Sequence, residues 1–180
     1  MKLTTKKICE AGIILAILVA SQIFKGISVY ITGPIVNACL VLATMLIGLK
    51  YGIILSVISP VTSFFITGTP VISACPIVLP LIMLGNVIMV FFIKLFYSNK
   101  KTKTNLMFGM AAGSVFKAAF MGSTIILAIT NTIVEGHALY KALPVLKMTF
   151  SVTQLITAVC GCILAFFIYY PVKKYIDKEL

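Results

Sequence analysis

The chain has 180 residues, of which 61% are hydrophobic and 11% are charged. This is far more apolar than a soluble globular domain, which excludes water as the main solvent and indicates a lipid bilayer. The net charge of +11 would suggest a nucleic-acid partner in a soluble protein, but here the basic residues are all lysines and most lie at the ends of apolar segments, so membrane topology explains them and no nucleic-acid partner is expected.

Six apolar segments follow one another along the chain. A spanning helix needs roughly 20 residues, so the chain holds six spans with short connections. The first segment is interpreted as a retained helix because its apolar run is long and lacks a small-x-small cleavage site. Gly33-Pro34 is predicted to precede the second segment, and Gly48 and Gly52 to separate the second from the third. The predicted helices cover about residues 8–28, 35–49, 52–66, 77–97, 106–132 and 146–170.

The link between the third and fourth segments, GTPVISACP at 68–76, is unusual. It is too apolar for a solvated loop, and its two prolines make it too broken for a helix. We expect it to fold back over one face of the membrane.

The lysines predict the topology. With six spans, most of them fall on one side, which the positive-inside rule makes cytoplasmic, whereas the opposite links carry only Lys141 and Lys147, with Lys25 at a helix end. We therefore predict an all-α integral membrane protein of six transmembrane helices, one membrane domain over 1–180, with cytoplasmic N and C termini in a prokaryotic plasma membrane. The lysines on the cytoplasmic side are Lys2, Lys6, Lys7, Lys50, Lys100, Lys101, Lys103, Lys173, Lys174 and Lys178.

Lys117 is the most informative polar residue. It lies about eleven residues into the fifth segment, roughly 16 Å deep, near the middle of the hydrocarbon. No acidic residue occurs at comparable depth. Contact with an anionic or strongly hydrogen-bonding ligand, a structural role with a lowered pKa or pairing to backbone carbonyls, and snorkelling to the surface all stay open.

Other polar side chains are predicted at middle and outer depths. Each alone is more often an interhelical hydrogen bond than a ligand contact. Thr149 and Thr153 share a helix face with Gln154 beside it, a stripe equally compatible with helix packing. Together with Lys117 they suggest a substrate pocket open to the outside. The candidates are Asn37, Asn86, Asn131, Thr149, Thr153 and Gln154.

Small residues at four-residue spacing form two ridges. One ridge is Gly12, Ala16 and Ala20 in the first segment, and Gly109 and Gly113 form a similar pair in the fifth. Such ridges let helices approach closely, so internal packing is the default interpretation and docking of another subunit the alternative.

The sequence offers little for catalysis or cofactors. His137 is the only histidine and lies in a link, and the five cysteines lack metal-ligand spacing, Cys160 and Cys162 included, so no catalytic residue, metal or cofactor is expected. There is no GxxxxGK[ST] loop, so an ATP-driven process would need a motor on another polypeptide.

Three stretches carry a resemblance to a family. They are GPIVNACLVLATMLIGLKYGIILSVISP at 33–60, GSVFKAAF around Lys117, and SVTQLITAVCGCILAF at 151–166. The chain resembles the substrate-binding S components of energy-coupling factor (ECF) vitamin transporters, which have a similar length, six helices and internal termini. The resemblance implies a substrate-binding subunit, not an enzyme, that takes up a small vitamin or precursor.

The resemblance also implies partners and moving parts. The partners would be a transmembrane coupling subunit, on which the Ala16–Ala20 ridge would dock, and two cytoplasmic ATPases. Links near 26–34 and 67–76 would close an outward-facing pocket. Substrate identity does not carry over, although Lys117 favours a ligand with an anionic group.

Two other classes of function stay open at this point. A standalone secondary transporter or small channel would be expected to show inverted repeats and intramembrane carboxylates, and neither is evident. A membrane scaffold without cargo would use the small-residue ridges for partner helices and Lys117 for structure.

Overall fold

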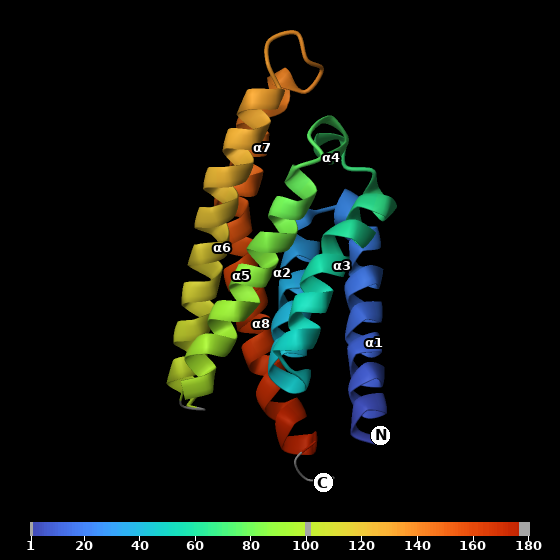
Figure 1. Ribbon diagram of the computed structural model, residues 1–180, viewed down its shortest axis with the longest axis vertical. Coiled ribbons are helices and arrows are strands. Elements are labelled where there is room, and N and C mark those ends of the chain that lie inside the picture. Colours follow the sequence, from blue (N-terminus) through green and yellow to red (C-terminus); the bar gives the residue numbers. More distant parts are fainter. Residues whose placement is uncertain (1, 100–101, 177–180) are drawn as a thin grey trace.

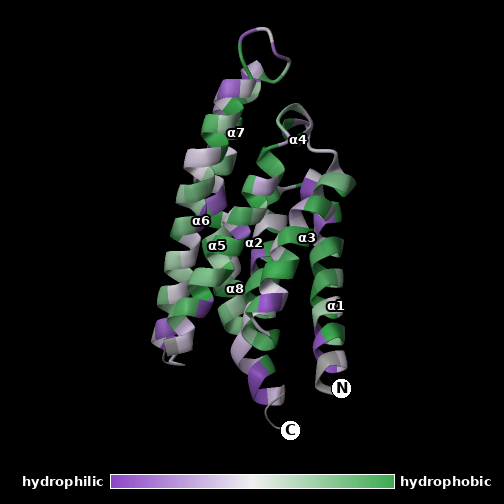
Figure 2. Cartoon of the chain, in the orientation of Figure 1, coloured by the Kyte–Doolittle hydropathy of each residue, from purple (hydrophilic) through white to green (hydrophobic). Residues whose placement is uncertain are grey.

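The protein is an all-helical bundle in the computed structural model, which describes residues 2–99 and 102–176 (Figure 1). Within these ranges, six helical stretches are long and apolar enough to cross a membrane. Most residues along these helices are hydrophobic, and hydrophilic residues are more frequent toward both ends of the bundle (Figure 2). This confirms the predicted membrane architecture. The helices are α1 (Lys2–Ile23), α2 (Val29–Leu42), α3 (Leu49–Thr67), α4 (Pro70–Ala74), α5 (Val78–Asn99), α6 (Lys103–Thr132), α7 (Leu143–Phe150) and α8 (Val152–Ile176).

The N and C termini lie at the same end of the bundle, and α4 and α7 lie toward the other end (Figure 1). An even number of spans requires this arrangement. Lys50, at the start of α3, and Lys103, at the start of α6, lie at the end with the termini. Three of the lysines counted for the topology, Lys100, Lys101 and Lys178, lie outside the described residues.

The start of the second span differs from the prediction. The structure starts α2 at Val29, where the Ser28 side chain accepts a hydrogen bond from the Tyr30 backbone N–H at 3.2 Å and caps the helix. Gly33-Pro34 therefore lies inside the helix, and the link expected near 26–34 is mostly helical. Proline is tolerated here because neighbouring helices can compensate for the lost backbone hydrogen bond.

Two further boundaries are corrected. The predicted sixth segment is divided, because α7 ends at Phe150 and α8 begins at Val152, with Ser151 in a non-helical conformation between them. The link at 68–76 does contain a helix, α4. Gly68 has φ +54 and ψ +42, a left-handed conformation that ends α3, and Pro70 at the first position starts α4.

Glycines set the closest helix contacts. A Cβ on Gly161 of α8 would lie 2.5 Å from the Asn37 Cβ and 2.7 Å from the Pro34 carbonyl oxygen, so α8 and α2 pack almost backbone to backbone. A Cβ on Gly113 would lie 2.7 Å from the Met89 carbonyl oxygen, and one on Gly109 would lie 3.0 Å from that of Ile93. The second small-residue ridge therefore packs inside the bundle, against α5.

Two apolar cores enclose a polar layer. On α6, Met110 belongs to the inner core, which lies nearer the termini, and Met121 belongs to the outer core, which includes residues of α4. Lys117 lies between these two methionines. On α5, Asn86 lies between Val78 of the outer core and Met89 of the inner core. Helix packing thus brings the polar side chains of several spans to a similar depth.

Candidate functional site

A polar cavity of about 230 Å³ lies in this layer. It is bounded by α1, α2, α3, α5, α6, α7 and α8, and by the segment that holds α4. Twelve of its nineteen lining residues carry amide, hydroxyl or ammonium groups, which are costly in a membrane interior unless they bind each other or a ligand. The polar lining residues are Gln22, Lys25, Thr32, Asn37, Ser59, Ser63, Thr69, Asn86, Lys117, Thr149, Gln154 and Thr157.

Lys117 is the deepest cation of the cavity. It is only 2% exposed, and its Nζ donates a hydrogen bond of 2.6 Å to Asn37 Oδ1. Its stem lies beside Gly85 of α5, where an added Cβ would be in ordinary van der Waals contact with the Lys117 Cγ at 3.8 Å. The ammonium therefore points toward α2 inside the bundle rather than toward the membrane surface, which rules out snorkelling.

Asn37 holds the other half of this contact. The residue is 2% exposed and belongs to the tight α2–α8 contact at Gly161. An amide oxygen is a neutral acceptor, so it satisfies one donor of the ammonium without neutralising its charge. The pair is a structural contact, and it does not neutralise the charge that Lys117 carries when protonated.

Asn86 is positioned by a proline on the facing helix. Pro60 has no N–H to donate to the Ser56 carbonyl oxygen one turn earlier in α3. The Asn86 Nδ2 instead donates to this oxygen, at 3.4 Å. Pro60 on α3 thus leaves a carbonyl oxygen without its helical donor, and Asn86 on α5 donates to it. This hydrogen bond holds the Asn86 amide at the cavity wall.

The outer part of the cavity holds polar residues that the sequence analysis did not predict. Gln22 Nε2 donates to the Ser59 carbonyl oxygen at 2.9 Å, and Lys25 Nζ donates to Ser63 Oγ at 2.6 Å. Serines at 56, 59 and 63 share one face of α3, and Gln22 and Lys25 stand three apart on the same chain segment. That spacing was the available signal for this polar face.

The remaining predicted residues divide into two groups. Thr149 and Gln154 line the cavity. Thr153 is buried, its Oγ1 lies 3.4 Å from the Tyr30 hydroxyl, and it does not line the cavity. Asn131 is exposed near the end of α6 and lies outside the cavity, because its side chain is on the outward face of the helix while Ile129 and Ile133 are buried in the apolar core. Thr157, which was not predicted, is 1% exposed and belongs to the lining.

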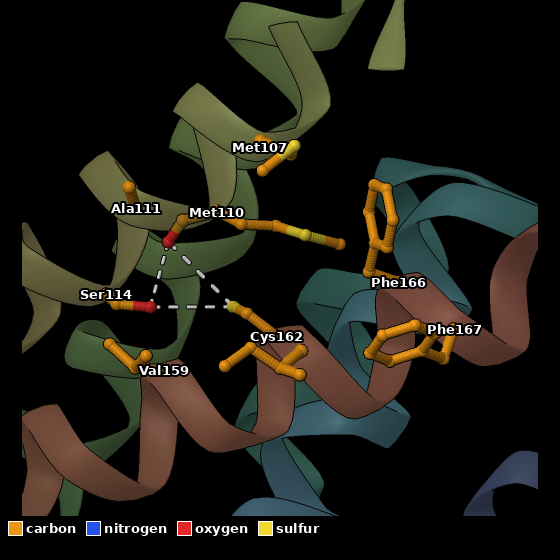
Figure 3. A pocket seen from close by; sticks show the side chains of 9 residues that line it. Met107, Met110, Ala111, Ser114, Val159, Cys162, Phe166 and Phe167 are labelled. Carbon is orange, nitrogen blue, oxygen red and sulfur yellow. Dashed lines mark hydrogen bonds between the residues drawn. The ribbon is translucent and has the colours of Figure 1, made fainter. Parts of the chain in front are cut away.

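A larger groove of about 360 Å³ lies between α6 and α8 (Figure 3). Ser114 Oγ donates to the Met110 carbonyl oxygen at 2.8 Å and lies 3.5 Å from Cys162 Sγ, so its few polar groups bind one another. Several lining side chains, such as Phe167 at 70% exposure, face outward where lipid tails lie. The groove is a lipid-facing surface feature, and the polar cavity is the candidate site.

The first ridge differs from the second in its surroundings. Gly12, Ala16 and Ala20 are all exposed on α1, and a Cβ on Gly12 would meet nothing within 4 Å. Beside them, Ile13 and Ile17 are also exposed. This face of α1 is not used to pack the bundle.

Comparison with known proteins agrees with this architecture. A family model described as ECF transporter, substrate-specific component, matches residues 6–173, nearly the whole chain. No curated protein and no solved structure gives a significant match.

Proposed function

The chain belongs to the substrate-specific components of ECF transporters, multi-pass membrane proteins that bind the transported substrate, and from this we propose that the polar cavity around Lys117 is its substrate site. The observation that supports this proposal is that the buried ammonium of Lys117 has a neutral hydrogen-bond acceptor, Asn37. In this proposal Asn37, Asn86, Thr149 and Gln154 form hydrogen bonds with a small vitamin or precursor. Thr153 has a supporting role, and Asn131 has no role in binding.

The proposed entrance lies beneath the segment that holds α4. Thr69 and Ile72 line the cavity, and Val71, Ile72 and Cys75 are buried in the same apolar core as α6 residues such as Ile125. A lid that opens this segment would expose the cavity on the side opposite to the termini. The helical start of α2 gives no support for a second mobile lid at 26–34.

The proposed partners are a transmembrane coupling subunit and two cytoplasmic ATPases in a prokaryotic plasma membrane, with both termini in the cytoplasm. The exposed Gly12, Ala16 and Ala20 ridge supports docking on this subunit, because small residues let another helix approach closely. Family membership favours this function over a standalone transporter or a scaffold.

Mass spectrometry of co-purified small molecules tests the proposed site. We expect wild-type protein extracted in mild detergent to retain one compound, and Lys117→Met to lose it because the charge that binds it is gone. Lys94→Met is the matched control, since Lys94 is a half-buried lysine that does not line the cavity. Equal amounts of the compound on Lys117→Met and wild type would contradict the proposed site.

A further inference from the structure

Among the residues that the structure describes, two lysines and no carboxylate line the cavity. Lys117 and Lys25 both line it, and no aspartate or glutamate does. In the described part of the chain the acidic residues are Glu10, on α1, and Glu135, which accepts a hydrogen bond from the Tyr140 hydroxyl beyond the end of α6. Neither lies at the cavity, so its charge is positive when both lysines are protonated.

The hydrogen-bond partners of both ammonium groups are uncharged. Lys117 donates to the Asn37 amide and Lys25 to the Ser63 hydroxyl. Two like charges in a weakly polar cavity repel each other, and dipolar partners compensate only part of that cost. A ligand with negative charge removes the repulsion, whereas a cationic ligand increases it.

The two lysines lie at different depths. The stem of Lys117 passes Gly85, and the next residue, Asn86, contacts α3 at Ser56. Lys25 contacts the same helix at Ser63, seven residues farther toward the outer end. At 1.5 Å per residue, the two levels are roughly 10 Å apart along α3. The Lys117 ammonium extends from this level to Asn37 on α2. A ligand that contacts both ammonium groups is therefore expected to carry two separated anionic groups.

The wall between the lysines suits an aliphatic molecule. Phe150 is the one aromatic side chain among the lining residues, and it is buried in the outer apolar core. Stacking of a flat heterocycle needs an aromatic face, which the cavity does not offer on both sides. Its volume of about 230 Å³ is below the range of about 300–1,000 Å³ for drug-sized ligands.

We propose that the substrate is a small aliphatic acid with two anionic groups, one bound by Lys117 in the depth of the cavity and the other by Lys25 near its entrance. Hydroxyl or amide groups between them would bind Asn86, Gln154 and Thr157. This inference rests on the proposed function of the same cavity. It adds Lys25 to the site and defines the substrate by charge and shape.

Fractionation by charge tests the proposal without knowledge of the compound. The dialysable small molecules of yeast extract are separated on an anion exchanger into unretained, weakly retained and strongly retained pools. Each pool is added to ligand-free protein, and the thermal unfolding midpoint is measured, since a molecule that binds only the folded state raises it. The proteins are wild type, Lys25→Met, Lys117→Met, Lys117→Gln, which keeps a donor for Asn37, and the control Lys94→Met.

We expect only the strongly retained pool to stabilise wild type and Lys94→Met. Both Lys117 variants should lose the effect, and Lys25→Met should need at least about tenfold more of the pool, as expected for a lost charged hydrogen bond. Stabilisation by the unretained or weakly retained pool, or an unchanged response of Lys25→Met, would overturn the proposal of a dianionic substrate. The proposal that the cavity is the substrate site would still stand. Stabilisation by no pool would overturn both proposals.

Discussion

The ammonium of Lys117 and the side-chain oxygen of Asn37 lie 2.6 Å apart although 80 residues separate them in the chain. Both residues are 2% exposed, so the contact is formed inside the membrane part of the bundle, between α6 and α2. It joins a charge to a dipole. The contact therefore orders the cavity wall without placing a counter-charge beside the ammonium.

The first prediction concerns this pair. Asn37→Leu should lower the free energy of unfolding by about 1.5–3 kcal/mol, because a buried ammonium loses its acceptor. The double variant with Lys117→Met should recover most of that loss, because no charge is then left unpaired. Unfolding in mixed micelles measures all four proteins of this cycle. Simple addition of the two single effects would show that the contact is energetically negligible.

The second prediction concerns the α2–α8 contact. Gly161→Ala should destabilise the protein by about 1–3 kcal/mol, because the new methyl group would overlap the Asn37 Cβ and the Pro34 carbonyl oxygen. Gly12→Ala is the matched control, since it makes the same change in an α-helix with nothing within 4 Å. Thermal unfolding of the two variants decides the matter. Gly12→Ala should be neutral or slightly stabilising, because alanine is a better helix former than glycine. A Gly161→Ala variant as stable as Gly12→Ala would show that the α2–α8 contact tolerates the methyl group.

The third prediction concerns Pro60 and Asn86. Asn86→Leu should cost about 1 kcal/mol in the wild-type background, the usual size of an interhelical hydrogen bond in a membrane. In a Pro60→Ala background the cost should be smaller, because the residue 60 N–H can then donate to the Ser56 carbonyl oxygen. Unfolding measurements on both backgrounds test this. An equal cost in the two backgrounds would show that the proline does not create the acceptor.

The fourth prediction concerns the proposed docking face. Ala16→Leu should leave folding and substrate binding unchanged and should abolish co-purification of the coupling subunit, because a bulky side chain prevents close approach of a partner helix. Ala119→Leu, an equal change at an exposed position on α6, is the control. Affinity purification from the native membrane provides the measurement. Retention of the coupling subunit by Ala16→Leu would place the docking surface elsewhere.

The two small-residue ridges look alike in the sequence, but they have different surroundings in the structure. Gly109 and Gly113 on α6 face the backbone of α5, whereas Gly12, Ala16 and Ala20 on α1 face outward. The four-residue spacing shows that one face of a helix carries small side chains. It does not show which neighbour packs against that face. The partner of each face depends on how the helices are arranged in the bundle.

The sequence alone determined the solvent, the number of spans and the shared end of the termini, because hydrophobicity, helix length and lysine placement act locally and the bilayer imposes them on each segment. It also identified Lys117, since a charge at that depth is conspicuous in any arrangement. Only the tertiary structure decided that Asn37 binds it, that Lys25 joins it in one cavity, and that Asn131 stays outside. Those relationships depend on helix rotation and crossing, which are set by contacts between residues distant in the chain.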